Sequence, residues 1–221
     1  MRIFVLAPHP DDEVLGAGGA IAWHVARGNE VHVGILTRGH PAIFSEDSIA
    51  QVRREAGQAH ELLGISRTHF CDELPAPGLD TVPHHVVTQV IRGWLQEIKP
   101  EVFYIPHRGD IHIDHRLAYH AALVAARPGY SSVRRILCYE TLSETEWSGP
   151  ALEDAFLPNV FVDISLHLET KQAAMRAYKS QLKSFPNPRS AENIEALARL
   201  RGATVQVPAA EAFILIREIC S

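Results

Sequence analysis

The sequence predicts an α/β protein, a Rossmann-like three-layer α/β/α sandwich with a mainly parallel sheet. Two observations predict this class. Short apolar runs rich in branched and aromatic residues, typical of strands buried on both faces, lie at 3–7, 31–36 and 101–106. Longer amphipathic segments separate these runs. Strands that alternate with helices of this length form right-handed crossovers, and so a parallel sheet covered on both faces.

The predicted helices end at residues that stop helices. The segments 14–27 and 47–63 end at Gly28 and Gly64, and glycine is favoured just past a helix C-terminus. The segments 82–98 and 115–126 each end before a proline, which cannot continue a helix. Four crossover helices therefore follow in order along the first 126 residues.

The remainder of the chain predicts further strands and two more helices. Strands are expected at 136–140 and 159–164. A helix carrying Lys171, Ala174 and Tyr178 follows, then a helix around 190–201 and a final strand containing the run FILIR. The place of this last strand in the sheet is left open by the sequence.

Composition excludes several classes of protein. The 221 residues contain no internal repeat or linker, which favours one domain spanning 1–221. A net charge of −5 without a basic cluster disfavours a nucleic-acid partner. No apolar stretch approaches the roughly 20 residues that span a bilayer, and the N-terminal apolar run is too short for a signal-peptide core. Three cysteines without a CxxC pair suit a reducing compartment, so we expect a cytoplasmic protein.

The first candidate site follows the first predicted strand. His9 lies between Pro8 and Pro10, and Asp11 and Asp12 follow directly before a helix. In open α/β sheets ligands bind at the carboxyl ends of the strands, so this loop lies where a site is expected. The alternative is that the carboxylates only cap the helix, since aspartate is favoured at the N-cap and near the positive end of the helix dipole. Capping accounts for one carboxylate but not for the histidine beside two.

A second polar cluster follows the strand at 101–106. It contains three histidines and two aspartates within nine residues, at positions 107, 110, 112, 114 and 115. If the strands at 3–7 and 101–106 are neighbours, the two loops face one crevice. Two imidazoles and one carboxylate with open positions are a common ligand set for a catalytic divalent metal. The alternative is a polar surface loop that happens to be rich in histidine.

The spacing within the first loop separates the two aspartates. Adjacent residues in an extended loop point in different directions, so Asp11 and Asp12 are not expected to bind one metal together. One carboxylate can ligate the metal while the other accepts a proton from a metal-activated water. Asp114, beside His115, is placed to orient a metal-binding imidazole by a hydrogen bond, without contacting the metal itself.

The pair of motifs resembles a known family. HPDDE at 9–13 with HIDH at 112–115 is similar to the paired signature of the PIG-L, or LmbE-like, zinc-dependent de-N-acetylases. Further segments that fit lie at 53–55, 63–65, 161–165, 178–181 and 210–213, so the resemblance extends along nearly the whole chain. The resemblance implies a hydrolase that removes acetyl from an N-acetylated sugar or glycoconjugate of the N-acetylglucosaminyl type.

The resemblance also implies roles for individual residues. Asp11 would be the general base. His112 would polarise the acetyl carbonyl and stabilise the oxyanion, and it is also a candidate to protonate the leaving amine. The zinc ligands would be His9, Asp12 and His115. Zinc is the expected cofactor, although two histidines with one carboxylate also suit Fe²⁺.

Three more positions match functional residues of the family. Asp114 matches an aspartate behind the ligands, and Tyr178 matches a tyrosine that can reach the substrate carbonyl. The substrate-binding arginine falls on Arg53, with Arg54 as the alternative because the helix is one residue short here. Trp147, in the variable stretch 140–158, could stack on a sugar face or be an ordinary buried aromatic.

Two rival functions share these motifs. A metal-dependent amidohydrolase acting on a non-sugar N-acyl substrate would need the same groups. A non-catalytic sugar-binding module is the rival from another class, although binding alone has no need for Asp11 beside a complete ligand set. A small-molecule substrate is the expected partner, and the family resemblance also implies self-association into a homo-oligomer.

Overall fold

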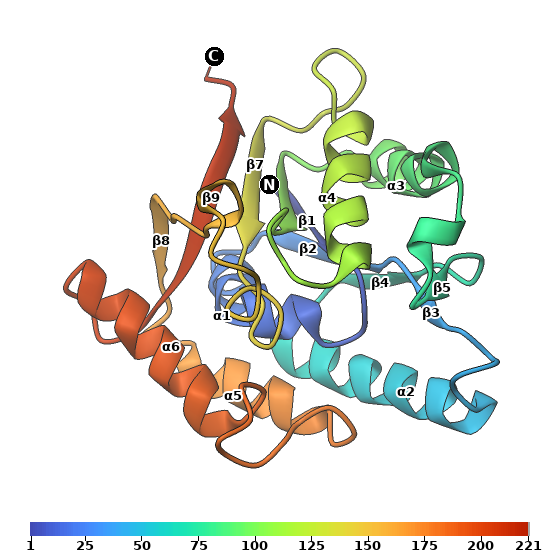
Figure 1. The fold of residues 1–221 in the computed structure, drawn as a ribbon. Coiled ribbons are helices and arrows are strands. Elements are labelled where there is room, and N and C mark those ends of the chain that lie inside the picture. The colour runs from blue at the N-terminus through green and yellow to red at the C-terminus, as the bar shows by residue number, and fades with distance from the viewer. Residues whose placement is uncertain (221) are drawn as a thin grey trace.

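The structure is a computed structural model that describes residues 1–220, and its ribbon is shown in Figure 1. The principal strands are β1 (Arg2–Ala7), β2 (Glu30–Ile35), β4 (Arg67–Phe70), β6 (Val102–Pro106), β7 (Arg135–Tyr139), β8 (Val160–Asp163) and β9 (Ala210–Glu218). The helices are α1 (Asp12–Ala26), α2 (Glu46–Leu63), α3 (His84–Ile98), α4 (Ile113–Ala125), α5 (Leu168–Ala177) and α6 (Ala191–Thr204). Two-residue strands β3 (Arg38–Gly39) and β5 (Pro75–Ala76) pair separately from the main sheet.

The seven principal strands form one sheet in the order β4-β2-β1-β6-β7-β9-β8. All neighbours are parallel except that β9 runs antiparallel to both β7 and β8. In the sheet, β2 lies on one side of β1 and β6 lies on the other side. The direction in which successive strands are added therefore reverses between β1 and β6. Such a reversal opens a crevice beyond the carboxyl ends of the two strands.

Two apolar cores lie on the two faces of the sheet. Alternate residues of β1 separate between them: Ile3 and Val5 belong to the core under α1, α2 and α5, whereas Phe4 and Leu6 belong to the core under α3 and α4. Figure 1 shows α3 and α4 on one side of the sheet and α1, α2 and α5 on the other. This alternation follows from the period-two geometry of a strand whose faces are both covered.

The predicted class and the mainly parallel sheet are confirmed. β1 and β6 are neighbours, which is the condition under which the two polar loops face one crevice. The sequence analysis missed β4, a four-residue edge strand, because its residues Arg67, Thr68 and His69 interrupt the apolar pattern. The last strand, whose place was open, inserts between β7 and β8.

The first helix packs closely on its neighbours because of its glycines. A Cβ at Gly16 would lie 2.1 Å from the ring of Tyr139, and one at Gly19 would lie 2.7 Å from Ile164. Any larger side chain would therefore push α1, together with the loop at its N-terminus, away from β7. Among residues 1–220, no helix combines the length and apolarity needed to cross a membrane.

Candidate active site and metal centre

The loops after β1 and β6 meet at the carboxyl edge of the sheet, as the strand order requires. The β1 loop is fixed to the loop after β2 by Thr37, whose hydroxyl donates to the Pro8 carbonyl at 2.7 Å. The β6 loop is fixed to the segment after β7, because the Ile111 amide donates to the Glu144 carbonyl at 3.1 Å. Four strands therefore contribute to one site.

Three side chains from these two loops could hold a metal ion together. One donor atom from each of His9, Asp12 and His115 lies within 4.8 Å of the other two. Asp12 Oδ2 is 3.5 Å from His9 Nδ1 and 3.2 Å from His115 Nε2. Asp12 and His115 are fully buried, whereas His9 faces the cavity.

The hydrogen bonds of this trio fit a divalent metal. Asp12 Oδ1 and His115 Nε2 are both buried and have no hydrogen-bond partner, which is costly for polar atoms in a protein interior. The other nitrogen of each imidazole is already used, since His115 Nδ1 donates to Asp110 at 2.8 Å and His9 Nε2 donates to Asp114 at 3.0 Å. A carboxylate behind each imidazole leaves the opposite nitrogen with a free lone pair, as metal-ligating histidines require.

A second combination, His9 with His112 and Asp114, fits a metal less well. Asp114 Oδ2 accepts from His9, and Oδ1 accepts from the Leu79 amide at 3.0 Å, so neither oxygen of this carboxylate is unused. The set His9, Asp12 and His115 therefore has the free donor atoms that a metal needs.

The charges around Asp12 keep its carboxyl group ionised. Burial alone would raise the pKa of Asp12, but the positive charge of protonated His115 and the hydrogen bonds from His115 and His9 outweigh burial and hold this pKa well below its usual value. A metal ion bound by the two imidazoles would supply that positive charge in place of their protons. An anionic carboxylate between two imidazoles is the protonation state in which a divalent cation can be bound.

Asp11 points away from the ligand set. Its backbone is left-handed, with φ of 106°, and its amide donates to Glu13 Oε2 at 3.2 Å. The carboxylate of Asp11 does not cap α1, although Asp11 occupies the N-cap position, so helix capping does not account for this side chain. Instead Asp11 Oδ2 accepts from Arg189 Nη1 at 2.9 Å. Burial raises the pKa of Asp11, and the positive charge of Arg189 opposes that shift.

His112 is a neutral imidazole with a defined tautomer. Its Nδ1 accepts from the Asp114 amide at 3.1 Å, which caps α4 and leaves the ring proton on Nε2. Burial, followed by the nearby His9, lowers the pKa of His112 to about 4. His112 therefore offers an N–H donor, without positive charge, at neutral pH.

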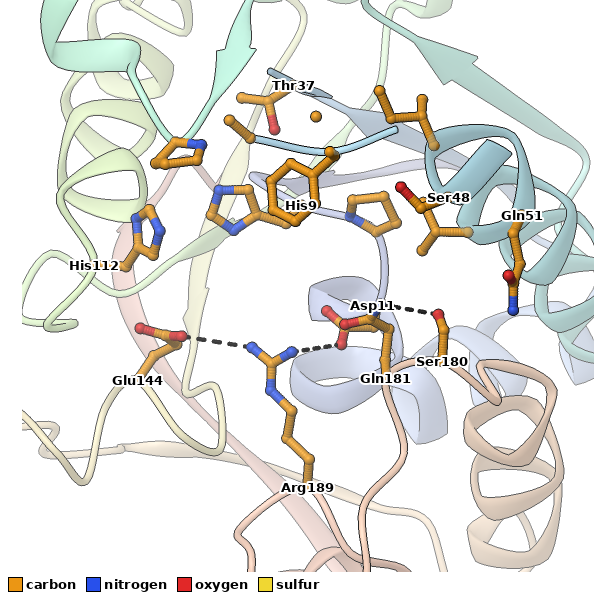
Figure 2. Close-up of a pocket in the computed structure, with 17 residues that line it drawn as sticks. His9, Asp11, Thr37, Ser48, Gln51, His112, Glu144, Ser180, Gln181 and Arg189 are labelled. Carbon is orange, nitrogen blue, oxygen red and sulfur yellow. Dashed lines mark hydrogen bonds and ion pairs between the residues drawn. The ribbon is translucent and has the colours of Figure 1, made fainter. Parts of the chain in front are cut away.

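His9, Asp11 and His112 line a cavity of about 300 Å³. Figure 2 shows Glu144 and Arg189 across this cavity from Ser48 and Gln51 of α2. The remaining lining residues are Pro10, Thr37, Gly39, Phe44, Ile49, Val52, Ala76, Pro77, Ser180 and Gln181. The volume is in the range of small-molecule sites.

Two residues singled out in the sequence lie elsewhere. Tyr178 is fully buried, and its hydroxyl donates to Glu13 Oε1 at 2.6 Å rather than facing the cavity. Arg53 does not line the cavity, because its guanidinium donates to Asp72 at 2.5 Å and lies over the Phe70 ring.

Trp147 is also outside the cavity lining. Its side chain is 55% exposed, so the interpretation as a buried loop aromatic is wrong.

Sequence reasoning missed several residues of the site. Arg189 lies in a loop between α5 and α6 with no recognisable motif, and only the folded chain brings it to Asp11. Asp110 stood in the second polar cluster, but its contact with His115 was not anticipated. Glu13 belongs to the HPDDE motif, and a third acidic residue directly after two aspartates was the signal available in the sequence.

Comparison with protein families gives one match over more than half of the chain. The model described as PIG-L, GlcNAc-PI de-N-acetylase, matches residues 4–126. This range contains both polar loops and the strands that carry them.

Two curated proteins illustrate the relatives. The uncharacterized deacetylase YaiS of Escherichia coli K12 is 28% identical over 187 residues, which cover 80% of this chain and 90% of YaiS. A 1D-myo-inositol 2-acetamido-2-deoxy-alpha-D-glucopyranoside deacetylase of Mycobacterium sp. strain JLS is 25% identical over 266 residues, covering 97% of this chain and 83% of the relative.

Solved structures share the whole fold. The conserved protein TT1542 from Thermus thermophilus superposes with a TM-score of 0.78 at 27% identity, covering 99% of this chain and 96% of TT1542. GalB, the 4-carboxy-2-hydroxymuconate hydratase of Pseudomonas putida KT2440, superposes with a TM-score of 0.76 at 21% identity, over 100% and 98% of the two chains. At that identity the likeness to the hydratase concerns the fold alone.

Proposed function

The chain belongs to the PIG-L family of de-N-acetylases, and on that premise we propose that it removes acetyl from an N-acetylated sugar or glycoconjugate, leaving a free amine and acetate. One observation carries this proposal. Asp12 and His115 have buried ligand atoms without hydrogen-bond partners, and the adjacent Asp11, a carboxylate outside the ligand set, lines the cavity together with the third ligand, His9. Binding alone does not need that second carboxylate.

The proposed metal ligands are His9, Asp12 and His115. Zinc bound there would lower the pKa of a coordinated water to about 7 and polarise the acetyl carbonyl. Two imidazoles and a carboxylate suit Fe²⁺ as well. The carboxylates of Asp110 and Asp114 orient the two imidazoles, which supports this ligand assignment.

Asp11 is proposed as the general base and then the general acid. Asp11 lines the cavity, where its carboxylate can take a proton from the attacking water and later deliver that proton to the leaving amine. Arg189 holds the carboxylate from one side and Glu13 holds the backbone amide, so the orientation of Asp11 is set before substrate binds.

His112 is proposed to donate its Nε2 proton to the acetyl oxygen as negative charge develops there. The Nδ1 contact fixes this tautomer, and a pKa of about 4 keeps the ring neutral at pH 7. A neutral imidazole acts here as a hydrogen-bond donor, in the manner of an oxyanion hole, and not as the source of the proton for the amine.

Arg189 is better placed than Arg53 for a role at the substrate. It lines the cavity, and its guanidinium also contacts Ser143 and Glu144 at 2.7 and 3.5 Å. The roles predicted for Arg53 and Tyr178 depend on side chains that point elsewhere here. Self-association, a cytoplasmic location and a single domain over 1–221 stay predictions.

Metal content and amine release test the proposal together. Protein purified without added metal should contain about one equivalent of zinc or iron per chain. It should also release acetate from N-acetylglucosamine derivatives until a chelator is added. Release from N-acyl amino acids but not from sugars would favour the non-sugar amidohydrolase. Metal without release from either panel would favour a binding module, and absence of metal with no rescue by added zinc would overturn the mechanism.

A further inference from the structure

One wall of the cavity has a chemical character that the proposed reaction does not explain. The reacting amide needs the polar side formed by His9, Asp11 and His112. Opposite the charged pair Glu144 and Arg189, the cavity is lined by apolar side chains: Phe44, Ile49, Val52, Ala76 and Pro77. Figure 2 shows this side of the cavity beside α2, which carries Ser48 and Gln51.

The fold builds this apolar wall from two elements. Ile49 and Val52 are three residues apart on α2, so their side chains lie on one face of the helix. The rest comes from the paired strands β3 and β5 and the residues after them: Ala76 ends β5, Pro77 follows it, and Phe44 lies in the turn between β3 and α2. Hydrogen bonds from the Arg38 amide to the Leu74 carbonyl and from the His40 amide to the Ala76 carbonyl hold the two strands together.

Gly39 of β3 lets Phe44 pack against the wall. A Cβ at Gly39 would lie 3.1 Å from Ile49 Cγ1 and 3.2 Å from the Phe44 ring. Contacts this short mean that the ring and the isoleucine are packed against the glycine backbone. The apolar surface is therefore held in place rather than formed by a freely moving side chain.

Phe44 is packed on one side and open on the other. Its side chain is 43% exposed, whereas Ile49 behind it is buried. An apolar ring that is fixed by packing and faces a cavity is suited to contact an apolar part of a ligand. Sugar hydroxyls placed against Phe44, Ile49 and Val52 would lose hydrogen bonds to water and gain none from these three side chains. The polar side chains on this helix that also line the cavity, Ser48 and Gln51, lie beside the apolar side chains and do not replace them.

We propose that the substrate carries an apolar aglycone, an alkyl or aryl group on the sugar, that packs on Phe44, Ile49 and Val52. This inference rests on the proposed function. The N-acetyl methyl group is too small to cover three side chains, so the group that reaches the wall belongs to the sugar side of the amide. A free sugar or a sugar joined to a polyol would leave the wall uncovered.

The first experiment compares substrates that differ only in the aglycone. Amine release is measured from methyl and from 4-nitrophenyl N-acetyl-β-D-glucosaminide with the metal-loaded enzyme. We expect kcat/KM to be at least about tenfold higher for the aryl glycoside, because burying an aromatic ring removes a large apolar area from water. Equal values for the two glycosides would overturn the inference while leaving the proposed deacetylation intact.

Phe44→Asn tests whether the wall is the source of the preference. The side chain is largely exposed, so the substitution removes an apolar contact without opening the core. We expect the aryl-to-methyl ratio of kcat/KM to fall towards one. The matched control is Leu62→Asn, near the C-terminal end of α2, with 53% exposure and outside the cavity lining, which should keep the full ratio. An unchanged ratio in Phe44→Asn would overturn the inference.

A binding measurement separates this inference from the reaction. Calorimetric titration with 4-nitrophenyl and methyl β-D-glucopyranoside measures how tightly each aglycone binds to the apolar wall. Neither glycoside carries an amide, so no turnover occurs during the titration. Tighter binding of the aryl glycoside that is lost in Phe44→Asn would support the apolar site even if no substrate released an amine. A third arm replaces acetyl by hexanoyl on the methyl glycoside. A Phe44-dependent gain there, with none from the aryl aglycone, would place the apolar group on the acyl side and overturn the proposal.

Discussion

Arg189 Nη1 donates a hydrogen bond to Asp11 Oδ2 at 2.9 Å and joins positions 178 residues apart in the chain. The contact brings a permanent positive charge to the carboxylate proposed as the base. Burial among acidic neighbours raises the pKa of Asp11, and Arg189 opposes the shift, so the arginine favours the ionised form that can accept a proton.

Removing the charge of Arg189 should therefore shift the pH dependence of catalysis. In Arg189→Gln the pKa of Asp11 should rise, and since the base acts in its ionised form, the acidic limb of kcat/KM should move up by about one pH unit. Arg189→Lys keeps the positive charge, so the acidic limb of kcat/KM should move less in this variant. A pH profile that is identical in the glutamine variant and the parent would contradict this role.

Asp11→Asn should separate metal binding from turnover. Asparagine tolerates the left-handed backbone found at position 11, so the loop should keep its shape. We expect kcat to fall by about 10² to 10⁴-fold, because the proton acceptor is lost, while metal content stays unchanged. Metal analysis and amine release on the same preparation check both expectations. His115→Ala is the opposite control and should lose bound metal.

Asp110 should control metal affinity without contacting the metal. Its Oδ2 accepts from His115 Nδ1, and its Oδ1 accepts from the Thr145 hydroxyl at 2.6 Å. Replacing Asp110 by Asn keeps the shape but removes the charge that makes the imidazole a stronger ligand, so the zinc Kd should rise about 10 to 100-fold. Competition with a chromogenic chelator measures this change. Asp154→Asn, a partly exposed carboxylate outside the ligand set, should leave the Kd unchanged.

Stability should fall in acid because of a histidine remote from the site. His24 is 5% exposed and hydrogen-bonded to the Tyr104 hydroxyl at 3.0 Å, and burial lowers its pKa to about 4. The unfolded chain binds a proton near pH 6.5, and the folded chain does so only near pH 4. The stabilising contribution of neutral His24 is thus complete above pH 6.5 and is lost between pH 6.5 and 4.

By this linkage the free energy of unfolding should drop by roughly 2 kcal/mol between pH 8 and pH 5 through His24 alone. Urea titrations at the two pH values measure the drop, and His24→Gln should reduce it by that amount. His120→Gln, at an exposed position, is the control and should not change the drop. An equal drop in His24→Gln and the parent would mean that other groups cause the acid sensitivity.

Much of the fold could be predicted because its main signals are local. Continuous apolar runs marked β1, β2 and β6, and glycines marked the ends of the first two crossover regions. The edge strand β4 escaped prediction because its polar residues lack the pattern of a buried strand. The antiparallel place of β9 was undecided, since pairing with β7 and β8 depends on contacts far away in the chain.

The sequence by itself determined that the polar loops after the strands at 3–7 and 101–106 would lie at one edge of the sheet, because parallel strands align their carboxyl ends. The choice of His9, Asp12 and His115 within these loops came from the family resemblance. Only the tertiary structure decided which atoms face one another. In the folded chain Tyr178 donates a hydrogen bond to Glu13, Arg53 to Asp72 and Arg189 to Asp11. The periodicity of a segment specifies its buried face. The partner of a long side chain depends instead on how loops from distant segments pack, and a local pattern does not encode that packing.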